Sequence, residues 1–135
     1  MYRRLIKPRQ AALNSAIRAR TEARILYHSC GAILPLMEDL IENGADILNP
    51  IQPLPGLMDP EILGERFGDR LIFHGGLDVQ SLLINGTPGE IREHVQHYLE
   101  VLGPERHILA PANTVLPATP AENLLAAYET ALCFQ

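Results

Sequence analysis

Residues 24–31 read R-I-L-Y-H-S-C-G, and this stretch decides how the rest of the chain is interpreted. Its apolar part, residues 25–27, ends abruptly at His28, and Gly31 follows as a turn signal. A short apolar run bounded by a turn is typical of a buried strand. Because residues two apart in an extended segment point to the same side, His28 and Cys30 are expected to face one site. His and Cys are preferred zinc ligands.

Composition limits the kind of protein this can be. The chain has 135 residues, of which 47% are hydrophobic and 20% charged, which predicts one globular domain over residues 1–135. A net charge of −5 argues against nucleic acid and anionic membrane surfaces as partners. No apolar run approaches the roughly 20 residues of a spanning helix, and no signal peptide is recognised. Two cysteines make no disulfide framework, so we expect a cytoplasmic protein.

Helical and strand patterns alternate along the chain. Residues 2–20 predict a basic amphipathic helix. Strands are expected at 24–28, 45–49, 70–73 and 107–110, and helices follow them at 33–43, 59–68, 87–102 and 119–132. The last two helices share a Thr-Pro-x-Glu start, which is typical of a capping box. Such alternation predicts an α/β fold whose parallel strands are joined by right-handed crossovers.

All four predicted strands end in residues that do not serve packing. In parallel α/β architecture the ligand site lies at the carboxyl ends of the strands, so we expect these residues to share one rim. A glycine pair there permits close backbone approach to a ligand. The rim residues are His28, Ser29, Cys30, Asn49, Gln52, His74, Gly75, Gly76, Asp78 and Asn113.

Several of these residues also have a purely structural interpretation. His74 is, taken alone, more typical of a hydrogen-bonded structural histidine than of a ligand. Asn49 stands before Pro50 and could brace a turn, and Asp78 could be only a helix N-cap. The spacing of His28 and Cys30 is by itself a weak motif.

Three histidines and one cysteine fall outside the rim. His94 and His97 are expected to be solvated on a polar helix face, and His107 is expected to be structural. Cys133 is interpreted as a small hydrophobe in an apolar helix.

Three motifs carry a resemblance to a known family: Y-H-S-C-G at 27–31, I-L-N-P-I-Q at 47–52 and F-H-G-G-L-D at 73–78. Together with the tail segments 108–111 and 120–123, they resemble the uroporphyrinogen decarboxylase superfamily. The likeness is to its decarboxylase-like branch, which includes corrinoid-linked methyltransferases. The resemblance implies a (β/α)8 TIM-type barrel. A whole barrel takes about 250 residues, so this chain would form about its C-terminal half, preceded by an N-terminal helix.

The resemblance also implies a zinc site. Methyltransferase members hold zinc through a His-x-Cys pair and a later Cys, and the zinc activates a thiol or similar methyl acceptor. His28 and Cys30 match the first two ligands. Asn113 stands at the position of the third, and asparagine is a poor zinc ligand. His74 or Asp78 could complete such a site from the next strand end.

Three functions remain open from the sequence. The first is a zinc-dependent methyl transfer to a thiol, with a cobamide (corrinoid) carried by a partner protein. The second is uroporphyrinogen decarboxylation, in which Asp78 would stabilise positive charge on a protonated pyrrole. The third is a catalytically inactive half-barrel. For the enzymatic interpretations, His74 and Asp78 are the candidate catalytic residues, and contacts to a small-molecule substrate are assigned to Asn49, Gln52, Gly75, Gly76 and Asn113.

A half-barrel needs a partner. Its sheet has two open edges and its apolar inner face is uncovered. We therefore expect a homodimer that closes a barrel-like ring, or a second chain that supplies the N-terminal half.

Overall fold

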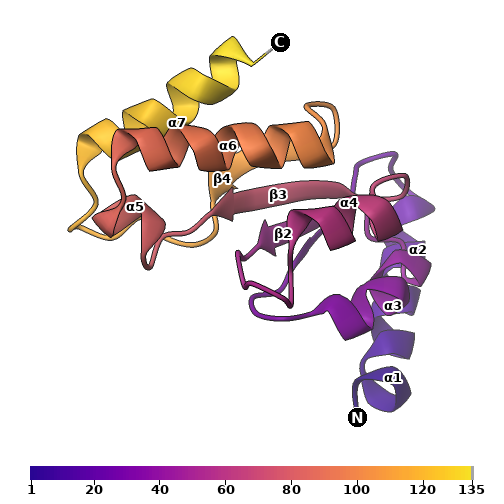
Figure 1. Cartoon of the computed structure of the whole chain (residues 1–135). Coiled ribbons are helices and arrows are strands. Elements are labelled where there is room, and N and C mark those ends of the chain that lie inside the picture. Colours follow the sequence, from indigo (N-terminus) through magenta and orange to yellow (C-terminus); the bar gives the residue numbers. More distant parts are fainter. Residues whose placement is uncertain (135) are drawn as a thin grey trace.

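The computed structural model describes residues 1–134, in which four parallel strands alternate with helices (Figure 1). The elements in chain order are α1 (Tyr2–Leu5), α2 (Lys7–Arg18), β1 (Leu26–His28), the 3-10 helix η1 (Leu34–Leu36), α3 (Met37–Glu42), β2 (Ile47–Ile51), α4 (Pro60–Phe67), β3 (Ile72–Leu77), α5 (Leu82–Asn85), α6 (Pro88–Leu102), β4 (His107–Pro111) and α7 (Ala121–Cys133). Among these residues, no helix is both long and apolar enough to cross a membrane.

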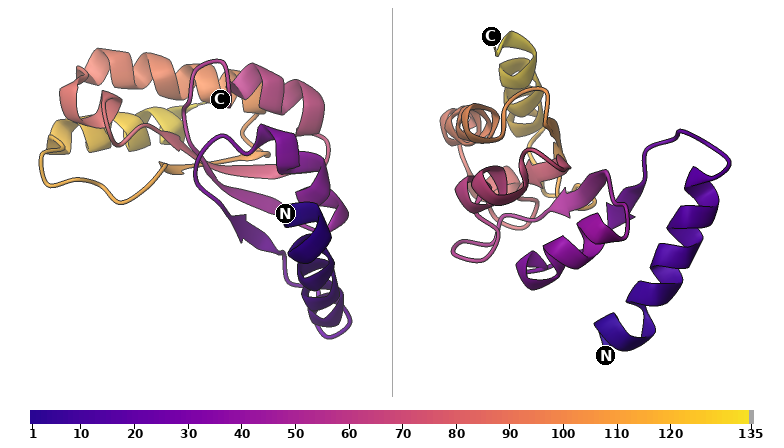
Figure 2. Two further views of the ribbon diagram at one scale, coloured as in Figure 1. Left: turned by 90° about the horizontal axis from the view of Figure 1, so that it is seen from below. Right: turned by 90° about the vertical axis from the view of Figure 1, so that its right-hand side faces the viewer.

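The strands lie in the order β1-β2-β3-β4, and each neighbouring pair is parallel. A doubly wound sheet reverses its strand order at a switch point, whereas the strands of a (β/α)8 barrel follow the order of the chain. The sheet therefore has the topology of about half of such a barrel, and the predicted fold class is confirmed. In Figure 2, α2 and α7 lie at opposite ends of this layered structure.

The core lies between the sheet and its helices. Leu48 of β2 and Phe73 of β3 are almost fully buried, and they pack in one cluster with Met37, Leu63 and Tyr98 from α3, α4 and α6. The other face of the sheet is open: Leu26 of β1 is 48% exposed and Ile108 of β4 is 43% exposed. Successive side chains of a strand point to opposite faces, so these residues occupy what would be the barrel interior.

The N-terminal helix predicted over residues 2–20 is in fact two helices, with a break at Ile6. Pro8 explains the break, because it has no N–H to donate to the carbonyl of Arg4 one turn earlier. The Arg9 guanidinium instead caps the carbonyl of Leu5. Arg9 thus serves the local structure at the break between the two helices.

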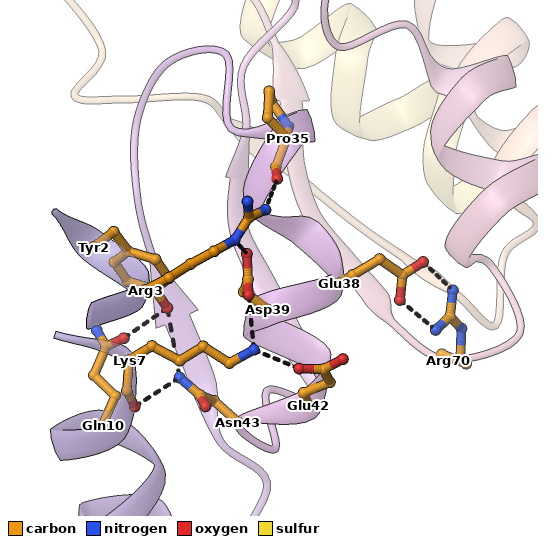
Figure 3. A network of polar contacts seen from close by, with 10 residues as sticks. All are labelled: Tyr2, Arg3, Lys7, Gln10, Pro35, Glu38, Asp39, Glu42, Asn43 and Arg70. Atoms are coloured by element: carbon orange, nitrogen blue, oxygen red, sulfur yellow. Dashed lines mark hydrogen bonds and ion pairs between the residues drawn. The ribbon is translucent and has the colours of Figure 1, made fainter. Parts of the chain in front are cut away.

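An ion-pair network fastens α1 and α2 to α3 (Figure 3). The nearly buried carboxylate of Asp39 accepts hydrogen bonds from Arg3 Nε and Lys7 Nζ, each at 2.7 Å. Lys7 also pairs with Glu42. The hydrogen bonds from Lys7 and Arg3 favour the anion, so they hold the pKa of Asp39 below its ordinary value.

Element boundaries differ from the expected ones where proline and glycine interrupt the patterns. Residues 33–43, expected to be one helix, divide into η1 and α3. β2 continues through the cis Asn49–Pro50 bond instead of ending at Asn49. β3 continues through Gly75 and Gly76 to Leu77, beyond the expected end at residue 73.

The two Thr-Pro-x-Glu starts behave differently. Thr87 Oγ1 accepts a hydrogen bond from Glu90 N, and the Glu90 carboxylate accepts one from Thr87 N at 2.7 Å, so the predicted capping box is confirmed. At the second start, Pro120 is the N-cap of α7, and Thr119 Oγ1 is buried without a hydrogen-bond partner. The second Thr-Pro-x-Glu start therefore does not form a capping box, and that prediction is wrong.

Candidate functional site

A row of hydrogen bonds crosses the carboxyl ends of β3, β2 and β1. His74 Nδ1 lies 2.7 Å from Asn49 Nδ2, and Asn49 Oδ1 lies 2.6 Å from His28 Nδ1. His28 Nε2 in turn lies 3.7 Å from Cys30 Sγ. Four of the residues predicted to share the rim are thus connected side chain to side chain.

The strand register explains why these side chains meet. His28 of β1 pairs with Asn49 of β2 in the parallel ladder, so the two side chains stand on the same face. Leu48 pairs with Phe73, which places the next residue along each strand, Asn49 and His74, beside one another. All three side chains face the open interior side of the sheet, opposite to the buried Leu48 and Phe73.

The amide of Asn49 fixes the tautomer of both histidines. Its nitrogen can only donate, so His74 Nδ1 accepts; its oxygen can only accept, so His28 Nδ1 carries the proton. A neutral imidazole has one protonated nitrogen, which leaves a lone pair on His28 Nε2. That lone pair faces the thiol of Cys30. Asn49 therefore orients His28 with Nε2 toward Cys30.

Two further strand ends reach the same place. Gln52, after β2, accepts a hydrogen bond from Gly31 N at 3.0 Å and so holds the turn after Cys30. Asn113, after β4, donates from Nδ2 to Cys30 Sγ at 4.0 Å. Gln52 and Asn113 thus join His28 near the exposed thiol of Cys30.

A small cavity of about 160 Å³ adjoins these residues. Asp78 stands in its wall, where the carboxylate accepts hydrogen bonds from Gln80 N at 2.8 Å and Leu82 N at 3.2 Å. Asp78 therefore caps the turn into α5 and also faces the cavity. The lining residues are Gln52, Asp78, Val79, Gln80, Ala112, Asn113, Thr114 and Leu116.

Gly75 and Gly76 have φ angles of +119° and +95°, which L-residues with side chains rarely adopt. A Cβ on Gly75 would lie 3.0 Å from the backbone N and O of Ile51, and one on Gly76 would lie 2.9 Å from the ring of Tyr98. The glycines thus permit a close approach, as expected, but the groups that approach them belong to the chain itself and not to a ligand. Their contact with a substrate stays a prediction.

Two histidines hold this glycine pair from the helix side. His94 Nε2 lies 2.6 Å from the carbonyl oxygen of Gly76, and His107 Nε2 lies 3.0 Å from that of Gly75. Burial destabilises an imidazolium, so the pKa values of His94 and His107 are both lowered. Both rings therefore donate as neutral imidazoles.

The prediction that His94 is solvated is wrong. Its ring is half-buried and packs 4.5 Å from Tyr98, whereas His97 is exposed as expected and pairs with Glu61. The helical period contained the signal, because His94 lies three residues after the buried Ile91 and four before the buried Tyr98. His107 is buried, as expected of a structural histidine.

Cys133 is exposed on α7, not buried as a small hydrophobe would be. It lines an open groove of about 460 Å³ between α6 and α7. No rim residue belongs to that groove.

The rim brings together two side-chain donors of the types that a zinc ion needs. His28 Nε2 and Cys30 Sγ are a nitrogen and a sulfur donor, which are the types that zinc prefers. Within residues 1–134 there is no group of three or more His, Cys, Asp or Glu side chains placed to hold one metal ion. A catalytic zinc uses three protein ligands, so this pair fits as two of them.

Comparisons with known proteins place the chain in a family. The family described as uroporphyrinogen decarboxylase (URO-D) matches residues 1–132. A methyltransferase from Methanosarcina mazei has a similar solved structure, with a TM-score of 0.76 and 24% sequence identity. The similarity covers 96% of this chain and only 36% of that one, and at this identity it establishes the shared fold. No curated protein sequence matches the chain. The chain belongs to the uroporphyrinogen decarboxylase family.

Proposed function

We propose that the chain carries a zinc-dependent methyl-transfer site with a thiol as the methyl acceptor. The observation that supports it most is the pair His28–Cys30, whose Nε2 and Sγ atoms lie 3.7 Å apart while Asn49 fixes the tautomer of His28. Hydrogen bonding of a ligand's second nitrogen is characteristic of metal-binding histidines. The methyl donor in this proposal is a corrinoid carried by a partner protein. The similarity in fold to a methyltransferase agrees with it.

The residues of this chain have separate tasks in the proposal. Zinc, when bound, would lower the pKa of a coordinated thiol and so supply a thiolate at neutral pH. His28 and Cys30 would hold the metal, and Asn49, backed by His74, would keep His28 in the binding tautomer. The cavity walled by Gln52 and Asp78 would receive the body of the acceptor.

Cobalt substitution tests this proposal. Co²⁺ bound to a thiolate gives charge-transfer absorption in the near ultraviolet, so the loaded protein should show this band and Cys30→Ser should lose it. Adding a small thiol should strengthen the band if the thiol becomes a further ligand. Cys133→Ser is the matched control and should leave the band unchanged. A band that survives Cys30→Ser, or no binding of Co²⁺ at all, would contradict the proposal.

The decarboxylase alternative has less support from this part of the barrel. The substrate of that reaction carries several carboxylates, which call for cationic side chains. Yet no Lys or Arg occurs at 25–65, 71–91 or 107–135, the segments that supply the strand ends. That absence concerns this part of the barrel alone, and the stronger ground is that the His28–Cys30 pair has no obvious role in decarboxylation.

A partner that closes the barrel remains part of the proposal. The exposed Leu26 and Ile108 on the inner face and the free outer edges of β1 and β4 support a second copy or a chain that supplies the remaining strands. If neither a metal nor a thiol binds to the closed form, the catalytically inactive half-barrel becomes the better interpretation.

A further inference from the structure

We infer that the cavity beside Cys30 selects a small, positively charged hydrogen-bond donor, such as a primary ammonium group, in the molecule that reaches the thiol. The inference rests on the proposed function for the role of that molecule as acceptor. The inference concerns the sign of the charge that the chain's own residues place at the rim. This property can be measured in the protein without a metal.

The cavity wall carries one ionisable side chain. Of its eight lining residues, only Asp78 is ionisable, and the other polar ones are amides and a hydroxyl. Each Asp78 oxygen accepts one backbone N–H, from Gln80 and from Leu82. A carboxylate has about four acceptor positions, so Asp78 retains capacity for a donor in the cavity.

None of the residues that line the cavity with Asp78 is a Lys or an Arg. All eleven Lys and Arg residues lie at 3–24, 66–70, 92 and 106. Those nearest the other ends of the strands are already paired: Arg18 and Arg24 with Asp46 before β2, and Arg70 with Glu38. Arg3, which reaches Pro35 O in the segment after β1, is paired with Asp39, and Arg92 lines the separate groove between α6 and α7. No Lys or Arg therefore lines the cavity that holds Asp78.

The cavity should therefore prefer a positively charged group over a negatively charged one. A carboxylate or sulfonate entering the cavity would meet Asp78 with no counter-charge, while an ammonium would gain a charge-assisted hydrogen bond and could also donate to the neighbouring amide oxygens. Near a protein surface, a carboxylate several ångströms away attracts an ammonium and repels a sulfonate. The difference between these two interaction energies is enough to change a rate or an affinity about tenfold.

Charge-selective modification of Cys30 tests the inference. The zinc-free protein is treated at low ionic strength with 2-aminoethyl or with 2-sulfonatoethyl methanethiosulfonate, and the rate at each cysteine is followed by peptide mass spectrometry. Cys133 is exposed in the same chain and serves as the internal reference. The ratio of ammonium to sulfonate rates should be about tenfold higher at Cys30 than at Cys133.

Two variants assign the effect to the cavity. Asp78→Asn keeps an acceptor oxygen for the α5 turn and should bring the two ratios close together. Thr114→Lys adds a positive charge at an exposed position on the cavity wall, so it should lower the Cys30 ratio without touching that turn.

Equal ratios at the two cysteines, or a preference of Cys30 for the sulfonate reagent, would overturn the inference. Either result would leave the Co²⁺ spectrum unaffected. A failure of the charge preference and a failure of the metal site are therefore separate outcomes.

Discussion

Replacing Gly76 by alanine should destabilise the protein, because Gly76 of β3 lies directly against Tyr98 of α6 and His107 of β4. Its φ angle is +95°, and an added Cβ would lie 2.9 Å from Tyr98 Cδ1 and 3.1 Å from His107 Nε2. Gly76 also accepts the hydrogen bond from His94 and stands between the rim residues His74 and Asp78.

Two costs add in this variant. A side chain in the left-handed region costs roughly 1–2 kcal/mol. Forcing a methyl group into packed neighbours costs about 1–3 kcal/mol, since neither the tyrosine ring nor the imidazole can turn away without losing its own contacts. We therefore expect Gly76→Ala to lower the free energy of unfolding by about 2–5 kcal/mol, a large share of the roughly 5–15 kcal/mol of a typical domain.

Urea unfolding followed by circular dichroism measures the loss, and two matched variants separate its parts. Gly103 has a φ angle of +79° with no atom within 4 Å of its Cβ position, so Gly103→Ala should show only the conformational cost. Gly89 lies in α6 with 3.8 Å of room, and Gly89→Ala should cost nothing. A loss in Gly76→Ala no greater than in Gly103→Ala would refute the packing argument.

Three further predictions follow from the same contacts. Asn49→Leu should weaken zinc binding about 10- to 100-fold in a chelator competition, while Asn49→Asp, which keeps an acceptor for His28 Nδ1, should retain it; equal loss in both would contradict the tautomer argument. Because the pKa values of His94 and His107 are lowered in the folded state, the unfolded chain binds more protons below about pH 6.5, so stability should fall as pH falls below that value. His107→Gln should flatten this fall in urea titrations at a series of pH values, and an unchanged slope would count against it. Thr87→Ala should lower the unfolding free energy by about 0.5–2 kcal/mol through loss of the α6 cap, and an unchanged urea midpoint would argue that the cap is dispensable.

The sequence predicted those parts of the fold that depend on local chemistry. The capping box at Thr87 and the alternation of strand and helix patterns needed only neighbouring residues, and both predictions are confirmed. Parallel topology then brought His28, Asn49 and His74 to one rim, since the carboxyl ends of parallel strands share an edge.

Features that depend on tertiary contacts were not predictable in the same way. β3 continues through Gly75 and Gly76. Glycine is required at both positions because Ile51, Tyr98 and His107 leave no room for a side chain there. From the sequence alone, two glycines after an apolar run indicate the end of a strand and the start of a loop.

The role of Asn49 as a bridge between two histidines also required the register. From the sequence alone, Asn49 was equally consistent with a turn brace or a substrate contact. In the structure, Asn49 of β2 lies between His28 of β1 and His74 of β3 and contacts both rings, so its amide orients His28.

Native mass spectrometry of the zinc-loaded protein tests the central claim most directly. It reports in one spectrum the number of chains and the number of metal ions in each species. We predict about one zinc per chain in the native protein and in Cys133→Ser, and none in Cys30→Ser or His28→Gln. A metal-free native protein, or zinc that persists in both Cys30→Ser and His28→Gln, would contradict the assignment of these residues as zinc ligands.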